Sequence, residues 1–421
     1  MTPIASEPPR APASTPRAPD APASGRGADA GEGAHRIRVL FVDDEPHVLE
    51  GLRRNLRELR DVWDVQYANG GSEALDLLSR SPCDVIVSDM RMPNIDGASL
   101  LETVRAQFPA TARIIFSGYS AQDATLRTLP VAHQFLAKPC RTEVVKDVVE
   151  RACALRDLVH QHQLFRALGG IDALPSLPES YRELQALLSR PEPDIVRVAE
   201  VIGKDMSMSA KLLQLTNSAF FALPRPLTSV SQAVNYLGLT TIRHLATQMA
   251  VFRAFEAKAA RPGFSLESLQ NRSLGVGRTA SRVARRTGAA NADAAFLAGL
   301  LHDVGLLVLA TTFPALDERI QSVARDKKLS RRDAEALELG TTHAELGGYL
   351  LGLWGLPADV VEAVCFHHEP SRRQHDAPQL TDVLYVAQFG DGSAVELDSI
   401  DWEHLKKMGL EQEAKRMLSR G

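Results

Sequence analysis

The chain has few cysteines, and none of them are paired in a redox or metal-binding spacing. Cys83, Cys140, Cys153 and Cys365 are scattered along 421 residues without a C-x-x-C pattern. Disulfide frameworks need several cysteines at short spacings, and they persist in oxidising compartments. The sequence therefore predicts reduced thiols in a cytoplasmic protein.

The chain also lacks a long uninterrupted apolar run and a strong charge of either sign. Its most apolar window, residues 296–313, contains His302 and Asp303, which would be costly to bury in lipid. The N-terminus lacks the apolar core of a secretory signal. The net charge of −4 gives no electrostatic basis for binding nucleic acid or an acidic membrane. We therefore expect no membrane span, no membrane partner and no nucleic-acid partner.

The length of 421 residues exceeds a single ordinary core and predicts two or three domains. Residues 1–35 are rich in Pro, Ala, Ser and Gly and have almost no large apolar side chains, so we expect a disordered tail. After the tail we expect an α/β domain at 36–155, a helical linker at 156–170 and an all-helical domain at 171–421.

Short apolar runs alternate with helical patterns in the α/β region. The runs lie near residues 39–42, 65–67, 84–89, 113–117 and 135–138. Strands that alternate with helices form parallel sheets covered on both faces. The sequence therefore predicts a doubly wound, five-stranded parallel sheet of the flavodoxin-like class.

Polar side chains stand where these expected strands end, and the carboxyl ends of parallel strands share one edge of a sheet. They are Asp43, Asp44, Asp89, Ser117 and Lys138. Three neighbouring carboxylates need a cation, and oxygen ligands suit Mg²⁺. An ammonium and a hydroxyl complete a site at which Asp89 can accept a phosphoryl group.

This region resembles the receiver domain of bacterial response regulators. The matching residues are Asp43, Asp44, Asp89, Ser117, Lys138 and Pro139, with Phe135 at the position of the family's switch aromatic. The resemblance implies that a histidine kinase phosphorylates Asp89 beside a Mg²⁺ ion held by the three aspartates. It also implies that Ser117 and Phe135 then move and reshape the face of the later helices. Receivers of this type often dimerise through those helices, so a homodimer is one expectation.

Beyond residue 170 the patterns are helical and indicate no strand, which predicts an all-α domain. Histidines gather in its second half as His302-Asp303, His343 and His367-His368. Such groups can bind a transition metal that activates water, as in the HD metal-dependent phosphohydrolases that this part of the chain resembles. Two positions depart from that pattern: Arg272 replaces its first histidine and Gln388 its late aspartate.

Residues 170–375 are more similar to the HDOD domain, a non-catalytic HD-like module of bacterial signalling proteins. The matching stretches are 201–205, 209–213, 217–219, 230–245 and 300–305. A guanidinium cannot ligate a divalent ion and repels it, so we expect neither a metal nor an enzyme here. The degenerate pocket would comprise Arg272, His302, Asp303, His343, His367, His368 and Gln388.

The main hypothesis is a two-component response regulator, a phosphoprotein whose HDOD domain binds a downstream signalling protein. A metal-dependent HD phosphohydrolase acting on cyclic di-GMP or a nucleotide is the first alternative. A DNA-binding regulator is the second, because residues 236–239 resemble the turn of a helix-turn-helix. The helix after that turn offers only Arg243, His244 and Gln248 for contacts with DNA.

Overall fold

A computed structural model shows the arrangement of the chain. It describes residues 36–118, 131–154, 164, 168–171, 174–176, 178–217, 223, 225–243, 253–254, 264–390 and 400–419. Several expectations lie outside these described residues: the tail at 1–35, most of the linker at 156–170, the helix expected between residues 117 and 135, and His244 and Gln248 of the helix that follows residues 236–239. The described residues fall into a sheet domain, residues 36–154, and a helical domain, residues 168–419.

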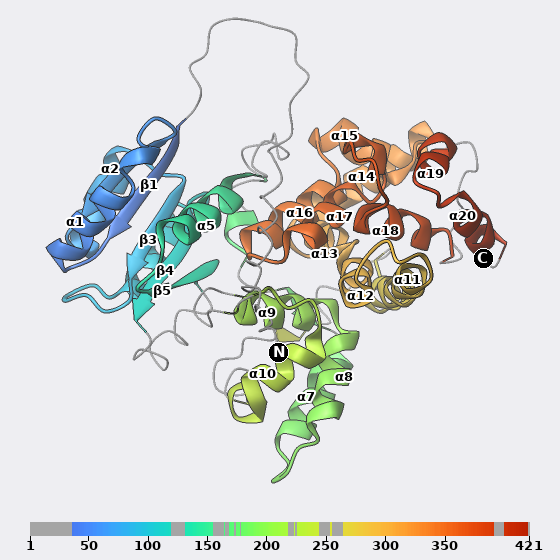
Figure 1. The fold of residues 1–421 in the computed structure, drawn as a ribbon, viewed down its shortest axis with the longest axis horizontal. Helices are drawn as coiled ribbons and strands as arrows, with labels where there is room; N and C mark the ends of the chain where they lie inside the picture. The colour runs from blue at the N-terminus through green and yellow to red at the C-terminus, as the bar shows by residue number, and fades with distance from the viewer. Residues whose placement is uncertain are drawn as a thin grey trace, which may run out of the picture. The chain divides into compact units, whose positions relative to one another are not determined.

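The sheet domain contains the expected five-stranded parallel sheet (Figure 1). In spatial order its strands are β2 (Trp63–Ala68), β1 (Ile37–Val42), β3 (Val85–Asp89), β4 (Ala112–Gly118) and β5 (Gln134–Lys138). The helices described between and after them are α1 (Pro46–Asn55), the 3₁₀ turn η1 (Arg57–Leu59), α2 (Gly71–Arg80), α3 (Gly97–Gln107) and α5 (Thr142–Ala154). All five residues of β3 are buried, as expected for a central parallel strand with both faces covered.

The helical domain is the expected all-α region, apart from one pair of two-residue parallel strands, β6 (Pro175–Ser176) and β7 (Arg253–Ala254). Its first half contains α7 (Pro178–Leu188), α8 (Ile195–Lys204), α9 (Met206–Thr216) and α10 (Val230–Arg243). The helix α10 is broken at Gly238, whose φ of 75° is not helical.

The second half of the helical domain carries the candidate pocket and is drawn in yellow to red (Figure 1). Its helices are α11 (Leu266–Thr287), α12 (Ala292–Leu301), α13 (Val304–Thr312), α14 (Pro314–Lys327), α15 (Arg331–Leu339), α16 (His343–Leu353), α17 (Ala358–Phe366), η7 (Pro370–Arg372), α18 (Leu380–Gln388), α19 (Trp402–Lys407) and α20 (Glu411–Leu418).

Two local features of the sequence position the pocket residues. Thr342 and Glu345 form a capping box that starts α16 at His343. The backbones of helices α11 and α12 pack directly against each other at two glycines. A Cβ added to Gly299 would lie only 2.6 Å from the Cα of Gly277, so a side chain would not fit there. This close approach brings the α11 residue Arg272 to the end of α12, where Asp303 follows.

The apolar segment Ala292–Thr312 is long and apolar enough to cross a membrane by length and composition alone. In the structure it is divided into α12 and α13, with His302 and Asp303 between the two helices. Within its most apolar window, 83% of the segment is buried inside the fold. This is the burial of core helices, in agreement with the expectation of no membrane span.

A buried histidine joins the sheet domain to the segment that follows it. The backbone N–H of Arg113 donates to His133 Nδ1 at 3.0 Å, so the ring hydrogen lies on Nε2 and is donated to the carbonyl of Gly169 at 2.9 Å. Complete burial, with the nearby charge of Arg113 as a second cause, lowers the pKa of His133 well below 6.5. His133 is therefore neutral in the folded protein at physiological pH.

We expect a His133→Gln variant to lose part of the acid sensitivity of the wild-type protein. The unfolded chain protonates this histidine below pH 6.5 while the folded chain does not. Stability therefore falls as pH drops below 6.5, by up to about 1.4 kcal/mol per pH unit for this one group. Urea unfolding followed between pH 7.5 and 5 measures the slope. An equal slope in wild type and variant would contradict the assignment.

Candidate functional site

The carboxyl edge of the sheet carries a cluster of two buried carboxylates and one ammonium. Asp43 directly follows β1, Asp89 ends β3, and Lys138 ends β5. Asp43 and Asp89 are only 1% and 8% exposed. Lys138 Nζ lies 2.6 Å from Asp43 Oδ2 and also donates to Asp89 Oδ1. The three side chains therefore meet, as the ends of the strands predicted.

The charges of this cluster depend on one another. Burial raises the pKa of Asp89, although Lys138 opposes the rise with a hydrogen bond and its charge. Burial also disfavours the ammonium of Lys138, but the two carboxylates outweigh that effect and raise its pKa. The second oxygen of Asp89, Oδ2, accepts a hydrogen bond of 2.5 Å from the backbone N–H of Arg91. Two acids share one cation here, which is the electrostatic setting that favours a further cation.

The other predicted residues of the sheet domain lie on the same strands or next to them. Asp44 is half-buried beside Asp43, and Ser117 is buried near the end of β4, next to β3. Phe135 is buried in β5, where it pairs with Ile115 of β4. Phe116 was not among the predicted residues, and its ring centroid lies 5.2 Å from Lys138 Nζ. A cation over an aromatic face gains electrostatic stabilisation, so Phe116 helps to hold the ammonium.

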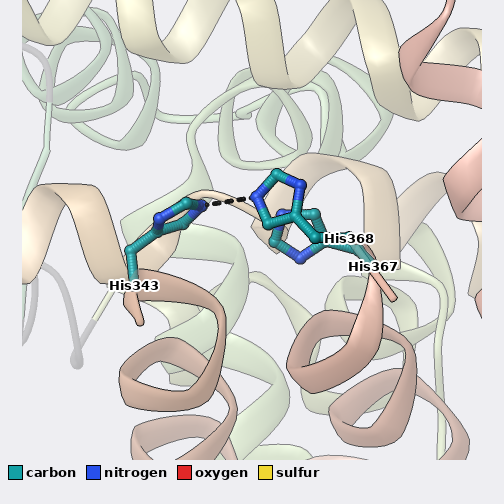
Figure 2. A group of neighbouring side chains, drawn as sticks. All are labelled: His343, His367 and His368. Atoms are coloured by element: carbon teal, nitrogen blue, oxygen red, sulfur yellow. Dashed lines mark hydrogen bonds between the residues drawn. The ribbon is translucent and has the colours of Figure 1, made fainter. Parts of the chain in front are cut away.

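In the helical domain, the structure brings the five pocket residues His302, Asp303, His343, His367 and His368 together. His302 and Asp303 link α12 to α13, His343 begins α16, and the adjacent pair follows α17. His343 Nε2 lies 3.5 Å from Asp303 Oδ1 and 3.0 Å from His368 Nε2 (Figure 2). His302 Nε2 lies 3.2 Å from Asp303 Oδ2.

Arg272 and Gln388 also lie beside this group, as the sequence comparison suggested. Arg272 Nη1 is 3.3 Å from Asp303 Oδ2, so the guanidinium faces one carboxylate oxygen while His343 faces the other. The amide of Gln388 donates to the backbone carbonyl of His367 at 2.9 Å. Gln388 therefore supports the main chain that carries the paired histidines.

Two contributions to this region were not visible in the sequence. Glu335, on α15 and fully buried, accepts hydrogen bonds from the backbone N–H of His343 at 2.8 Å and from His343 Nδ1 at 2.6 Å. Burial alone would lower the pKa of His343, but Glu335 and Asp303 outweigh it and raise the pKa to about 9.

A second cluster joins His375, Asp382 and His404, with both imidazoles bonded to the carboxylate at 2.8 and 2.6 Å.

A doubly wound parallel sheet with acids and a lysine at its carboxyl edge defines a receiver-type domain, and comparison with known proteins agrees. The family model described as "Response regulator receiver domain" matches residues 39–150, and the HDOD domain model matches residues 174–370. The chain therefore contains a receiver domain followed by an HDOD domain, which indicates a response regulator with an output domain.

Individual relatives resemble the chain in part. An uncharacterized protein of Treponema pallidum is 26% identical over 53% of this chain. Response regulator protein PilR of Pseudomonas aeruginosa is 32% identical over 29% of it. The chain spans only 44% and 27% of the lengths of these two relatives. The crystal structure of the MmoQ response regulator from Methylococcus capsulatus, 22% identical, matches 59% of this chain and 98% of its own, with a TM-score of 0.45.

Proposed function

We propose that this response regulator is a cytoplasmic phosphorelay protein in which a histidine kinase phosphorylates Asp89. The observation that carries the proposal is the pairing of Lys138 with both Asp43 and Asp89 at the carboxyl edge of the sheet. In the reaction, an Asp89 oxygen attacks the phosphorus of a kinase phosphohistidine. The phosphorus–nitrogen bond breaks as the new phosphorus–oxygen bond forms.

The residues around Asp89 fit the stabilisation that such a transfer needs. Asp43, Asp44 and Asp89 offer the oxygen ligands that Mg²⁺ prefers, and the ion would offset charge on the transferring oxygens. Lys138 supplies a second positive charge at the same edge, and it already bonds to the attacking carboxylate. The hydroxyl of Ser117, near the end of the neighbouring strand β4, would donate to a phosphoryl oxygen.

The proposed output is a change in protein binding by the HDOD domain, and β5 supports such a link. Lys138 lies at one end of this strand, in the phosphorylation site. At the other end, Gln134 Nε2 donates to the Leu353 carbonyl of α16 at 3.1 Å, and the His133 carbonyl accepts from Gln214 of α9 at 2.9 Å. A shift of β5 after phosphorylation would therefore act directly on two helices of the HDOD domain.

We expect Lys138→Met to slow phosphorylation of the protein by acetyl phosphate about 100-fold. The variant keeps most of the unbranched side chain but removes the ammonium that faces Asp89. The initial rate of label incorporation in the presence of Mg²⁺ is the measurement. Lys146→Met is the matched control, because Lys146 lies on an exposed face of α5, where it pairs with Glu150. Equal rates in the Lys138 variant and wild type would refute this role.

The phosphohydrolase alternative rests on the retained imidazoles of the HDOD domain. Arg272 occupies the side of Asp303 opposite His343, and the amide of Gln388 is bonded to the main chain. A guanidinium cannot ligate a metal ion, so the contact of Arg272 with Asp303 supports a domain that binds partners without hydrolysing a substrate. A turnover assay with cyclic di-GMP separates the two functions.

A further inference from the structure

The second cluster of histidines lies at the start of α18, outside the pocket that contains Arg272 and Asp303. His375 precedes this helix, Asp382 lies in its first turn, and His404 is on α19. One ligand atom from each of these three residues lies within 4.8 Å of the other two. All three follow residue 370, where the match to the HDOD domain model ends. The cluster is therefore a feature of this chain that the family match does not cover.

Both ring nitrogens of His375 face oxygen acceptors. Nδ1 lies 2.8 Å from the backbone carbonyl of Arg373, and Nε2 lies 2.8 Å from Asp382 Oδ2. A neutral imidazole carries one ring hydrogen, so it can satisfy only one of these two contacts. When that hydrogen is donated to the carbonyl, the lone pair of Nε2 points at a carboxylate oxygen. A cation is then needed between the two atoms.

The carboxylate of Asp382 is fully buried, and its charge has no lysine or arginine beside it in the part of the chain that the structure describes. Its ion-pair partners are the imidazoles of His375 and His404. Buried charges in proteins are paired with an opposite charge or coordinate a metal ion. Two neutral imidazoles leave this carboxylate uncompensated, whereas one divalent ion held by all three side chains would neutralise it.

Hydrogen bonds from outside the cluster hold its ligand atoms in place. The carbonyl of Arg373 holds the far nitrogen of His375, and the backbone N–H of Gln379 donates to Asp382 Oδ2 at 2.7 Å. A ring nitrogen that binds a metal usually has its opposite N–H on a carbonyl or carboxylate, and a ligating carboxylate is itself hydrogen-bonded. The surroundings of His375 and Asp382 have both properties.

We propose that His375 Nε2, His404 Nε2 and the carboxylate of Asp382 bind one divalent transition-metal ion. Two imidazoles and one carboxylate suit Zn²⁺ better than Mg²⁺ or Ca²⁺, and three protein ligands leave a fourth position for water. The side chains of His375 and His404 are 6% and 8% exposed, so the ion can enter from the surface. The sequence-based expectation of no metal in this domain rested on Arg272 and Gln388 and took no account of this cluster.

The ion would fasten α19 to the start of α18. Ligand atoms around a tetrahedral Zn²⁺ are about 3.3 Å apart, whereas His404 Nε2 lies 2.6 Å from Asp382 Oδ1 and His375 Nε2 lies 2.8 Å from Oδ2. Binding therefore moves both rings outward by roughly half an ångström. His375 lies between η7 and α18, outside any helix, so it can make this shift without disturbing one.

The test compares Zn²⁺ binding by the full-length protein and its variants. Chelator-treated protein is equilibrated with Zn²⁺, and bound metal is counted by elemental analysis. His404→Gln is expected to bind one ion fewer per chain than wild type, and ions held elsewhere in the chain cancel in this difference. His47→Gln is the matched control, because the side chain of His47 is 76% exposed on α1, and it should bind as many ions as wild type.

His375→Gln provides a second variant if circular dichroism shows that His404→Gln does not fold. It should weaken Zn²⁺ binding by more than the 10- to 100-fold, roughly, that loss of an outer hydrogen-bond partner costs. Zn²⁺ should also raise the thermal midpoint of wild type by more than that of the variant, because an ion bound only by the folded chain stabilises it. Equal numbers of bound ions in wild type and the folded variant would overturn the proposal and leave a second proton on His375 as the cation.

Discussion

Asp89→Asn is expected to reduce Mg²⁺-dependent phosphorylation by acetyl phosphate to background. The substitution keeps the size of the side chain, and its single amide oxygen can still accept a hydrogen bond from either Lys138 or Arg91. It removes the carboxylate, and a neutral amide is a far weaker nucleophile toward phosphorus. Intact-protein mass spectrometry after incubation with the phosphodonor measures the phosphorylated fraction directly.

Asp96→Asn is the matched control for this experiment. Asp96 lies seven positions beyond Asp89 and caps α3 by accepting from the backbone N–H of Ser99 at 2.8 Å. Asparagine caps helices about as well as aspartate, so this variant should be labelled like wild type. Labelling of Asp89→Asn at the wild-type rate would place the phosphoryl group elsewhere.

Gly305→Ala is expected to destabilise the HDOD domain by about 3 kcal/mol or more. Gly305 lies in the first turn of α13, packed against the start of α16. A Cβ there would overlap the carbonyl oxygen of His343 and lie 2.7 Å from its carbonyl carbon and 3.0 Å from the backbone nitrogen of Gly347. These are backbone atoms, which cannot rotate away, so one helix must move. Urea unfolding of the full-length variant measures the loss.

Gly275→Ala is the control for the same change in a helix of the same domain. Nothing lies within 4 Å of a Cβ built on Gly275, which is in the interior of α11. Alanine favours helix over glycine by about 1 kcal/mol, so this variant should be as stable as wild type or more stable. Equal stability of the two alanine variants would show that α13 and α16 are not packed as described.

The sequence anticipated the receiver site well because strand direction alone determines where its residues go. Asp43, Asp89 and Lys138 each stand where an apolar run ends, and in a parallel sheet those ends share an edge. No long-range packing has to be known to bring them together. Contacts between individual side chains could not be predicted in this way. The contact of Phe116 with Lys138, for example, depends on the orientation of the phenyl ring.

The HDOD pocket shows the limit of such reasoning. Motif comparison identified His302, His343 and His367 and the replacement at Arg272, but not the direction in which each ring points. That direction depends on Nδ1 partners such as Glu335, which lies on a different helix from His343 and follows no recognised pattern.

By itself, the sequence determined the class of each domain and the side chains that meet at the edge of the sheet, because periodicity and strand order follow from local residue patterns. Only the tertiary structure decided that ring nitrogens of His343, His367 and His368 converge and that Arg272 contacts the oxygen of Asp303 that faces away from His343. The reason is physical: ring orientation is set by hydrogen bonds and packing between helices that are remote in the chain.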